Sequence, residues 1–361
     1  MKLIALMKKT NLNKFLAAGL VLAGIGLASS ASAATEVLFG GGNASQTILY
    51  DRVTNLFGGS GITATIASSN STVRSYVGSI PGAPAGVNPV TLEFSLLGAG
   101  QGLIDVSGNH TERTALGNNV VPAVGVSSGN PEVFAVAPNL FSNGVQTLII
   151  PYAYIKNATE SPNLANVTNL TQFQAVYLEG AAGTFPSIVL GGSSTNDVVY
   201  FVGRNTASAV RREVDANIHY TGSISTWTNG PTGPEVDPAG GQNSGSAVRA
   251  ILAAIPESIG TVGSSDISTD TPLAFEGVPY SIANVEAGLY PLWYYEQWFF
   301  AKSPTTPLTA NQLYVATNLL AAVTNDTFQT TASVFTNYFV PLQHITVSRP
   351  SDGGPITSNT Y

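Results

Sequence analysis

The chain has 361 residues, of which 44% are hydrophobic and 10% are charged, and its formal net charge is −7. This apolar content excludes a largely disordered chain, and the acidic balance argues against nucleic acid or an anionic membrane as a bulk partner. Cysteine is absent, so disulfides, thiolate metal sites and a lipid-modified cysteine are excluded. The three histidines are scattered along the chain, and we therefore expect neither a metal site nor a cofactor.

The first 33 residues have the pattern of a secretory signal peptide. Four lysines come first, at Lys2, Lys8, Lys9 and Lys14. They precede an apolar run, Phe15 to Leu27, that is short for a membrane span. Ala31-Ser32-Ala33 then forms a small-x-small cleavage site. We expect a mature chain that starts at Ala34 and is periplasmic or secreted; the alternative is an uncleaved membrane anchor.

Short apolar segments alternate with amphipathic stretches in the first part of the chain, which is the pattern of an α/β fold. Strands are expected at 37–39, 62–66, 90–97 and 121–126. A helix is expected at 44–57, and a shorter one after the turn at 98–102. The apolar segment Leu148–Lys156 is predicted to be a strand that crosses from one lobe to another.

The same alternation continues to the end of the chain. A helix is predicted with Asn169 as its N-cap, Gln172 at the third helical position and Gly180 just past its end. Further expected elements are a strand at 198–202, a helix at 208–218, a loop at 229–245, a helix at 247–255, a strand at 259–262, and closing helices at 310–322 and 328–339. Pro291–Ala301 is predicted to be a second crossover strand.

Two crossover strands predict two α/β lobes, each with its own sheet. The first lobe would combine residues 34–150 with 290–361, and the second would contain residues 151–289. Glycine or serine turns recur between a strand and a following helix. Each such turn leaves helix N-terminal N–H groups at the carboxyl end of a strand, where α/β proteins bind anions.

Several short motifs stand in a fixed order along the chain: 40–50, 98–102, 126–131, 204–210, 256–261 and 290–292. In this order they resemble the periplasmic phosphate-binding protein family, the two-lobed solute receptors of ABC importers with the type II periplasmic-binding fold. The resemblance implies a set of ligand-binding positions: Asn43, Ala44, Ser45, Ala99, Gly100, Gln101, Ser127, Ser128, Arg204, Thr206, Ser208, Ala209 and Val210.

The chain departs from the family at several of these positions. Ala44, Ala99 and Val210 stand where the family offers hydroxyls. Ser128 stands where an aspartate accepts a proton of the ligand, and Thr206 replaces the aspartate that partners the arginine. Arg204 and Ser208 remain, together with the backbone turns. The resemblance therefore implies weaker discrimination between phosphate and fully ionised oxyanions than is usual in the family.

Individual residues allow simpler interpretations as well. Arg204 is either an anion clamp or a surface arginine, and Ser127 and Ser128 either donate to an anion or cap a turn. Asn43 and Ser45 are equally explained as helix N-caps. The aromatic run from Trp293 to Phe299 resembles a sugar-binding platform, but on a crossover strand core and hinge packing is favoured.

The leading hypothesis is a non-catalytic, monomeric solute-binding protein of the phosphate-binding type. It would hold a small oxyanion such as phosphate between its lobes and deliver it to an ABC-type permease. The alternative is a secreted structural or adhesion protein that keeps the fold without tight ligand binding. An enzyme ranks third, because no Ser-His-Asp order, HExxH motif or phosphate loop with lysine is present.

Overall fold

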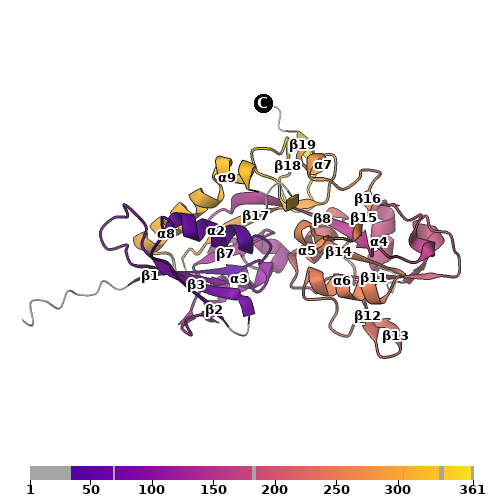
Figure 1. The fold of residues 1–361 in the computed structure, drawn as a ribbon, viewed down its shortest axis with the longest axis horizontal. Helices are drawn as coiled ribbons and strands as arrows, with labels where there is room; N and C mark the ends of the chain where they lie inside the picture. Colours follow the sequence, from indigo (N-terminus) through magenta and orange to yellow (C-terminus); the bar gives the residue numbers. More distant parts are fainter. Residues whose placement is uncertain (1–33, 68–69, 181–183, 304, 333–336, 359–361) are drawn as a thin grey trace, which may run out of the picture.

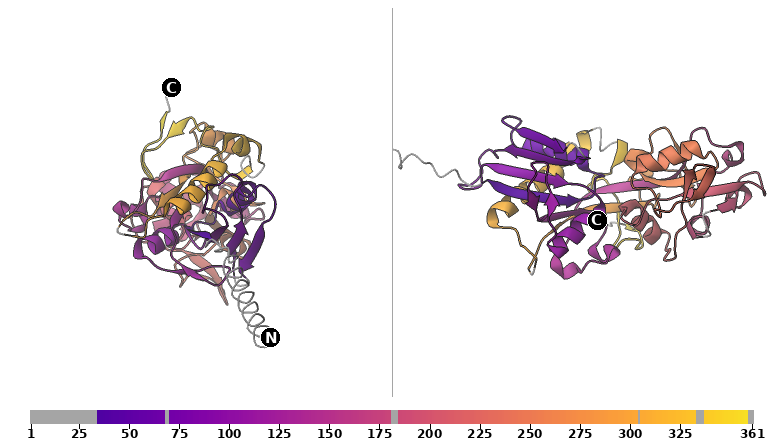
Figure 2. Two further views of the ribbon diagram at one scale, coloured as in Figure 1. Left: turned by 90° about the vertical axis from the view of Figure 1, so that its left-hand side faces the viewer. Right: turned by 90° about the horizontal axis from the view of Figure 1, so that it is seen from below.

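The computed structural model describes residues 34–358 apart from 68–69, 181–183, 304 and 333–336. The expected signal peptide lies outside the described residues. The described chain forms two α/β lobes that are joined by long strands (Figures 1 and 2). Within these ranges, none of the helices combines the length and apolar character needed to cross a membrane.

The strands of the main sheet are hydrogen-bonded in a single continuous order. From one end to the other they are β10 (Thr184–Pro186), β11 (Val198–Val202), β14 (Ser258–Gly263), β8 (Val145–Lys156), β17 (Trp293–Phe300), β7 (Val124–Ser127), β1 (Thr35–Gly41), β4 (Val90–Ser95), β3 (Asn70–Gly78) and β2 (Thr63–Ala67), with β15 (Thr271–Pro272) also on β8. The pairs β1–β4, β1–β7 and β11–β14 are parallel, and both crossover strands run antiparallel to their neighbours. Parallel pairs within each lobe and antiparallel crossings between the lobes give the mixed sheet its two-lobed form.

Strand β8 is shared by the two lobes. Its residues up to Pro151 pair with β17, and its residues from Tyr152 onward pair with β14. The hydrogen-bonded ladder is therefore continuous, and the expectation of a separate sheet in each lobe was wrong. The physical reason is the length of β8, whose 12 residues provide one pairing segment for each lobe.

The main helices pack on the strands of their own lobe (Figure 1). On the first lobe, α3 (Ala99–Gly108) packs against β1 and β7, while α8 (Ala310–Val323) packs against β1 and α2 (Gln46–Leu56). On the second, α5 (Ala209–Asn217) and α6 (Gly245–Ala254) pack against β14. The remaining helices are α4 (Gln172–Gly180), α7 (Ile282–Glu286) and α9 (Asp326–Thr331). Short pairs of strands complete the described chain: β5 (Glu112–Arg113) with β6 (Asn119–Val120), β9 (Asn169–Leu170) with β16 (Ala274–Phe275), β12 (Trp227–Gly230) with β13 (Gly233–Val236), and β18 (Val347–Ser348) with β19 (Thr357–Ser358).

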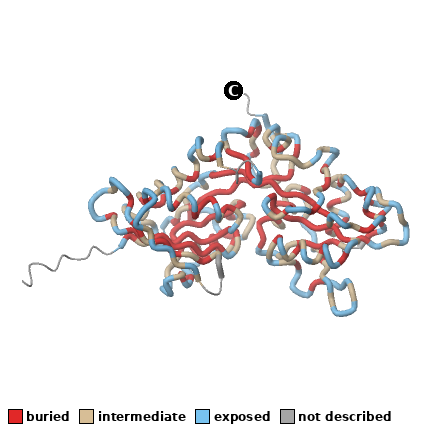
Figure 3. The backbone as a smooth tube through the Cα atoms, in the orientation of Figure 1, coloured by how far each residue is buried: buried red, intermediate tan, exposed pale blue. Residues whose placement is uncertain are grey.

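The core follows the central strands through both lobes, where the buried backbone is concentrated (Figure 3). Phe39 stacks on Phe94 with ring centroids 5.3 Å apart, and Trp298 meets the Phe39 ring edge-on at 5.2 Å. Trp293 and Trp298 are fully buried. The aromatic run on β17 thus belongs mainly to the core, as the crossover interpretation predicted.

Three local predictions were wrong. The expected loop at 229–245 contains most of the hairpin of β12 and β13, whose residues are exposed or half-buried. The cap of α4 is Thr171, whose hydroxyl accepts the Gln174 N–H at 3.2 Å, and not Asn169, which lies on β9. Helix α9 ends at Thr331 because Ala332 is extended, so no single helix spans 328–339.

Candidate functional site

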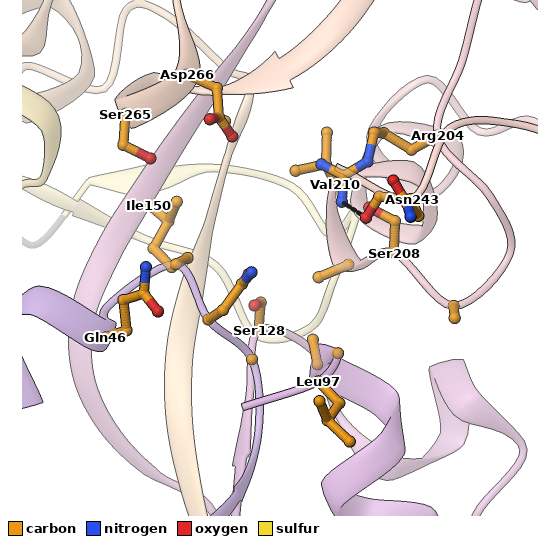
Figure 4. A pocket seen from close by; sticks show the side chains of 18 of the residues that line it. Gln46, Leu97, Ser128, Ile150, Arg204, Ser208, Val210, Asn243, Ser265 and Asp266 are labelled. Carbon is orange, nitrogen blue, oxygen red and sulfur yellow. Dashed lines mark hydrogen bonds between the residues drawn. The ribbon is translucent and has the colours of Figure 1, made fainter. Parts of the chain in front are cut away.

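A pocket of about 370 Å³ lies between the two lobes. The first lobe lines it with the turns that begin α2 and α3 and with Ser128, which follows β7. The second lobe contributes the turn between β11 and α5 and the turn that follows β14. Ile150 of β8 lines it between these two sides (Figure 4). Tyr294 of β17 is also part of the lining. Four strand-to-helix turns and both crossover strands therefore meet at one place.

Three of the helices that begin at this pocket have no side-chain cap. The N-caps of α2, α3 and α5 are Ser45, Gly98 and Ser208, and none makes a side-chain capping hydrogen bond. By contrast, the caps of α6, α7, α8 and α9 all accept a backbone N–H: Ser244, Ser281, Thr309 and Asn325. A capping side chain would satisfy the N–H groups that an anion uses. The three N-termini thus lack the side-chain caps that would compete with an anion, and they place the positive ends of helix dipoles at the pocket.

Glycines allow the turns of the first lobe to approach each other closely. Gly41 has a φ of 144°, and a Cβ there would lie 1.9 Å from the Val126 carbonyl oxygen. The Gly42 N–H donates to that oxygen at 2.9 Å, and the Gly98 N–H donates to the Gly41 oxygen at 2.9 Å. These bonds fix the start of α3 beside the start of α2. Glycine is needed at position 41 because no side chain fits between these backbones.

Arg204 is the arginine that lines the pocket. Its Nε donates to the Gln242 carbonyl at 3.2 Å and its Nη2 to the Asn243 carbonyl at 3.1 Å. These two bonds hold the guanidinium in place and leave its Nη1 hydrogens for a ligand. Burial lowers the pKa of Arg204, and Asp266 partly offsets this effect. A fixed guanidinium beside helix N-termini is suited to two directed bonds with an oxyanion.

Asp266 is the carboxylate in the same pocket, and the sequence analysis did not identify it. It ends a short 3₁₀ turn, Ser264–Asp266, that follows β14. Burial raises its pKa, and Arg204 and Arg249 partly offset the rise. Among the described residues, no group of three or more acidic or histidine side chains is placed to hold a metal ion.

The structure brings eight of the predicted ligand positions to the pocket wall: Asn43, Ala44, Ala99, Ser128, Arg204, Ser208, Ala209 and Val210. The other five do not line it: Ser45, Gly100, Gln101, Ser127 and Thr206. Each of these has a local role instead. Ser45 is buried at the start of α2, and Gly100 packs under Phe134. The Gln101 side chain donates to Asp105, and the Ser127 hydroxyl donates to the Gly129 carbonyl at 2.8 Å. The Thr206 carbonyl accepts from Arg212 at 3.0 Å.

Other lining residues were missed by the sequence analysis. They include Gln46, Leu97, Ile150, Asn243, Ser265 and Tyr294. Burial raises the pKa of Tyr294, while a hydrogen bond with Ser128 lowers it. This contact joins the end of β7 to the second crossover strand. The only signal in the sequence was position, since Ile150 and Tyr294 lie on the two segments predicted to cross between lobes.

No family model matches the sequence, and no curated protein matches it. Solved structures do match. A phosphate ABC transporter substrate-binding protein from Clostridium perfringens, with bound phosphate, is 13% identical with a TM-score of 0.55, and the match covers 85% of this chain and 100% of that one. An ABC-type phosphate transport receptor from Vibrio cholerae is 14% identical with a TM-score of 0.54, covering 84% and 100%. The resemblance predicted from the motifs is confirmed at the level of the fold. The chain has the two-lobed α/β fold of phosphate ABC transporter substrate-binding proteins.

Proposed function

We propose that this chain is an extracytoplasmic solute-binding protein that holds an oxyanion between its lobes for an ABC-type importer. The observation that carries the proposal is the coincidence of three uncapped helix N-termini with one fixed arginine around a single pocket. Donors of this kind bind anions without performing chemistry on them. The structural neighbours, which are named for phosphate transport, support the same assignment.

In this proposal the chain works as a monomer in the periplasm or outside the cell. Lobe one comprises residues 34–150 and 290–361, and lobe two comprises residues 151–289. The oxyanion would contact the N-termini of α2 and α3 from lobe one, and Arg204 with the N-terminus of α5 from lobe two. Because the donors come from both lobes, a bound anion would favour their closure by a hinge motion about the crossover strands.

Calorimetric titration with phosphate and with sulfate tests the proposal. We expect Arg204→Ala to weaken binding of both anions by about 1.5–3 kcal/mol for each charge-assisted bond that is lost. The matched control is Arg113→Ala, which removes the same charge from an exposed position on β5. Equal binding by wild type and Arg204→Ala would place the site elsewhere.

A second candidate function is a secreted structural or adhesion protein with the same fold. It is favoured by the lining at Ala44, Ala99 and Val210, which offers methyl groups where hydroxyl donors would strengthen an anion site. Under this alternative, wild type binds no oxyanion at millimolar concentration, organic oxyanions included. That result would remove the transport proposal.

A further inference from the structure

Arg204 and Asp266 both come from the second lobe and line separate parts of the pocket (Figure 4). They influence each other electrostatically, since each shifts the pKa of the other, yet they form no ion pair in the described part of the chain. Arg204 is instead fixed by the carbonyls of Gln242 and Asn243. The second-lobe side of the pocket therefore presents a cation and a carboxylate at separate positions.

The fold holds Asp266 in this position and leaves its carboxylate oxygens free to accept hydrogen bonds. Its Oδ2 lies only 2.2 Å from where a Cβ of Gly245 would be, so the first residue of α6 must be glycine to make room for the carboxylate. Arg249 is committed to Asp270, with Nε and Oδ2 2.7 Å apart. In the described residues the Asp266 carboxylate accepts no hydrogen bond, and it is only half-buried. It is available to a ligand.

A fully ionised oxyanion is disfavoured by this charge pattern, because it has no hydrogen to donate to Asp266. Placed against Arg204 and the helix N-termini, its negative charge would face a second negative charge at low dielectric, which disfavours binding. A ligand that carries a positive donor on its other end removes this conflict, because the donor would pair with Asp266. The volume of about 370 Å³ is in the range of pockets for small organic ligands. Ala44, Ala99 and Val210 would contact the apolar part of such a ligand.

We propose that the ligand is a small zwitterion, with an oxyanion head bound by Arg204 and the helix N-termini and an ammonium group bound by Asp266. This inference rests on the proposed function and narrows its substrate class. It assigns Asp266 as the residue that selects between ligands with the same anionic head. It also gives a role to the alanines and valine at positions where hydroxyls would favour a bare tetrahedral anion.

Calorimetric titration with a matched ligand pair tests the inference. The probes are 2-aminoethylphosphonate and propylphosphonate, which have the same shape but differ by an ammonium in place of a methyl group, with inorganic phosphate as reference. We expect wild type to bind 2-aminoethylphosphonate more tightly than either other probe by about tenfold or more. Asp266→Asn keeps the shape and removes the charge. It should bring the two phosphonates to within about twofold of each other while propylphosphonate binding is kept or strengthened.

The outcomes separate this inference from the proposed function. If wild type binds propylphosphonate or phosphate as tightly as 2-aminoethylphosphonate, or if Asp266→Asn keeps the preference, the zwitterion is wrong and the oxyanion proposal stands. If none of the three probes binds, the proposed function falls as well. Propylphosphonate binding by Asp266→Asn shows that the variant is folded. Asp51→Asn, an exposed change on α2, is the control and should keep the full preference.

Discussion

Arg349 lies over the ring of Trp293, with its guanidinium carbon 4.1 Å from the ring centroid. Its Nη1 donates to the Trp293 carbonyl at 3.0 Å and its Nη2 to the Pro291 carbonyl at 2.7 Å. Nη1 also donates to Asn217 at the end of α5. One buried side chain near the C-terminus thus ties the start of the second crossover strand to a helix of the other lobe.

Arg349→Lys should lower the free energy of unfolding by about 2–4 kcal/mol, because an ammonium cannot replace the directed bonds of the planar guanidinium. Burial lowers the pKa of Arg349, and its neighbours Tyr152 and Glu213 partly offset this effect. Urea denaturation measures the change. Arg113→Lys, at an exposed position, is the matched control and should shift stability by less than about 0.5 kcal/mol. A loss no larger than the control's would show that these bonds contribute nothing.

Two glycines on α3 should respond in opposite ways to alanine. A Cβ on Gly102 would lie 2.0 Å from the Gly40 carbonyl oxygen, so Gly102→Ala must push α3 away from β1 and should cost about 1–3 kcal/mol. A Cβ on Gly108 would meet only the exposed His110 ring at 2.7 Å, and that ring can move. Gly108→Ala should therefore be neutral or stabilising by up to about 1 kcal/mol. Thermal unfolding of both variants decides this; equal effects would mean that the backbone contact of α3 with β1 is not tight.

Glu112 should make the protein less stable as the pH rises. Burial, together with the neighbouring Asp105, raises the pKa of this carboxyl from 4.5 to about 8. The folded chain therefore binds more protons than the unfolded chain between these two pH values, so the stability contribution is lost as the pH rises through them. Each pKa unit corresponds to about 1.4 kcal/mol.

Glu112→Gln should remove this part of the pH dependence. The difference in unfolding free energy between the variant and wild type should change in favour of the variant by up to about 4 kcal/mol from pH 5 to pH 8. Taking the difference cancels the other carboxyls that titrate in the same range. Glu132→Gln, at an exposed position, should run parallel to wild type. If the unfolding free energy of Glu112→Gln also changes with pH as that of wild type does, Glu112 is ionised in the folded chain.

The elements that the sequence predicted are those with a buried apolar face. Leu148–Lys156 and Pro291–Ala301 were expected to be crossover strands, and β8 and β17 occupy them. Strand β3 was not expected, because polar residues interrupt its apolar positions and its stability comes from pairing with β4. The β12–β13 hairpin was missed for a related reason: none of its residues is buried, so no hydrophobic period marks it.

The parts of the site that are formed by backbone turns were predictable from the sequence. The parts that depend on residues distant in the sequence coming together were not. Glycine and serine turns indicated the starts of α2, α3 and α5, and Arg204 stood out as a charged residue between a strand and a helix. Asp266 has no such signal, because Ser264-Ser265-Asp266 reads as an ordinary polar turn. Its role is visible only when Gly245 of α6 is seen beneath its carboxylate. Ser127 was expected to contact the ligand as Ser128 was. It lies one residue earlier, and its hydroxyl instead donates to the Gly129 carbonyl of the local turn.

The placement of β17 has a consequence for synthesis and assembly. In the sheet this strand lies between β7 and β8, although the chain reaches it more than 130 residues after β8 ends. Helix α8, made still later, packs on α2 and β1. Until almost the whole polypeptide exists, β7 therefore lacks its neighbour β17, and the face of β1 that α8 covers stays open. The elements β11, α5, α6 and β14 of the second lobe follow one another in the chain and can associate sooner. A growing chain of this topology stays incompletely folded until translation is nearly finished.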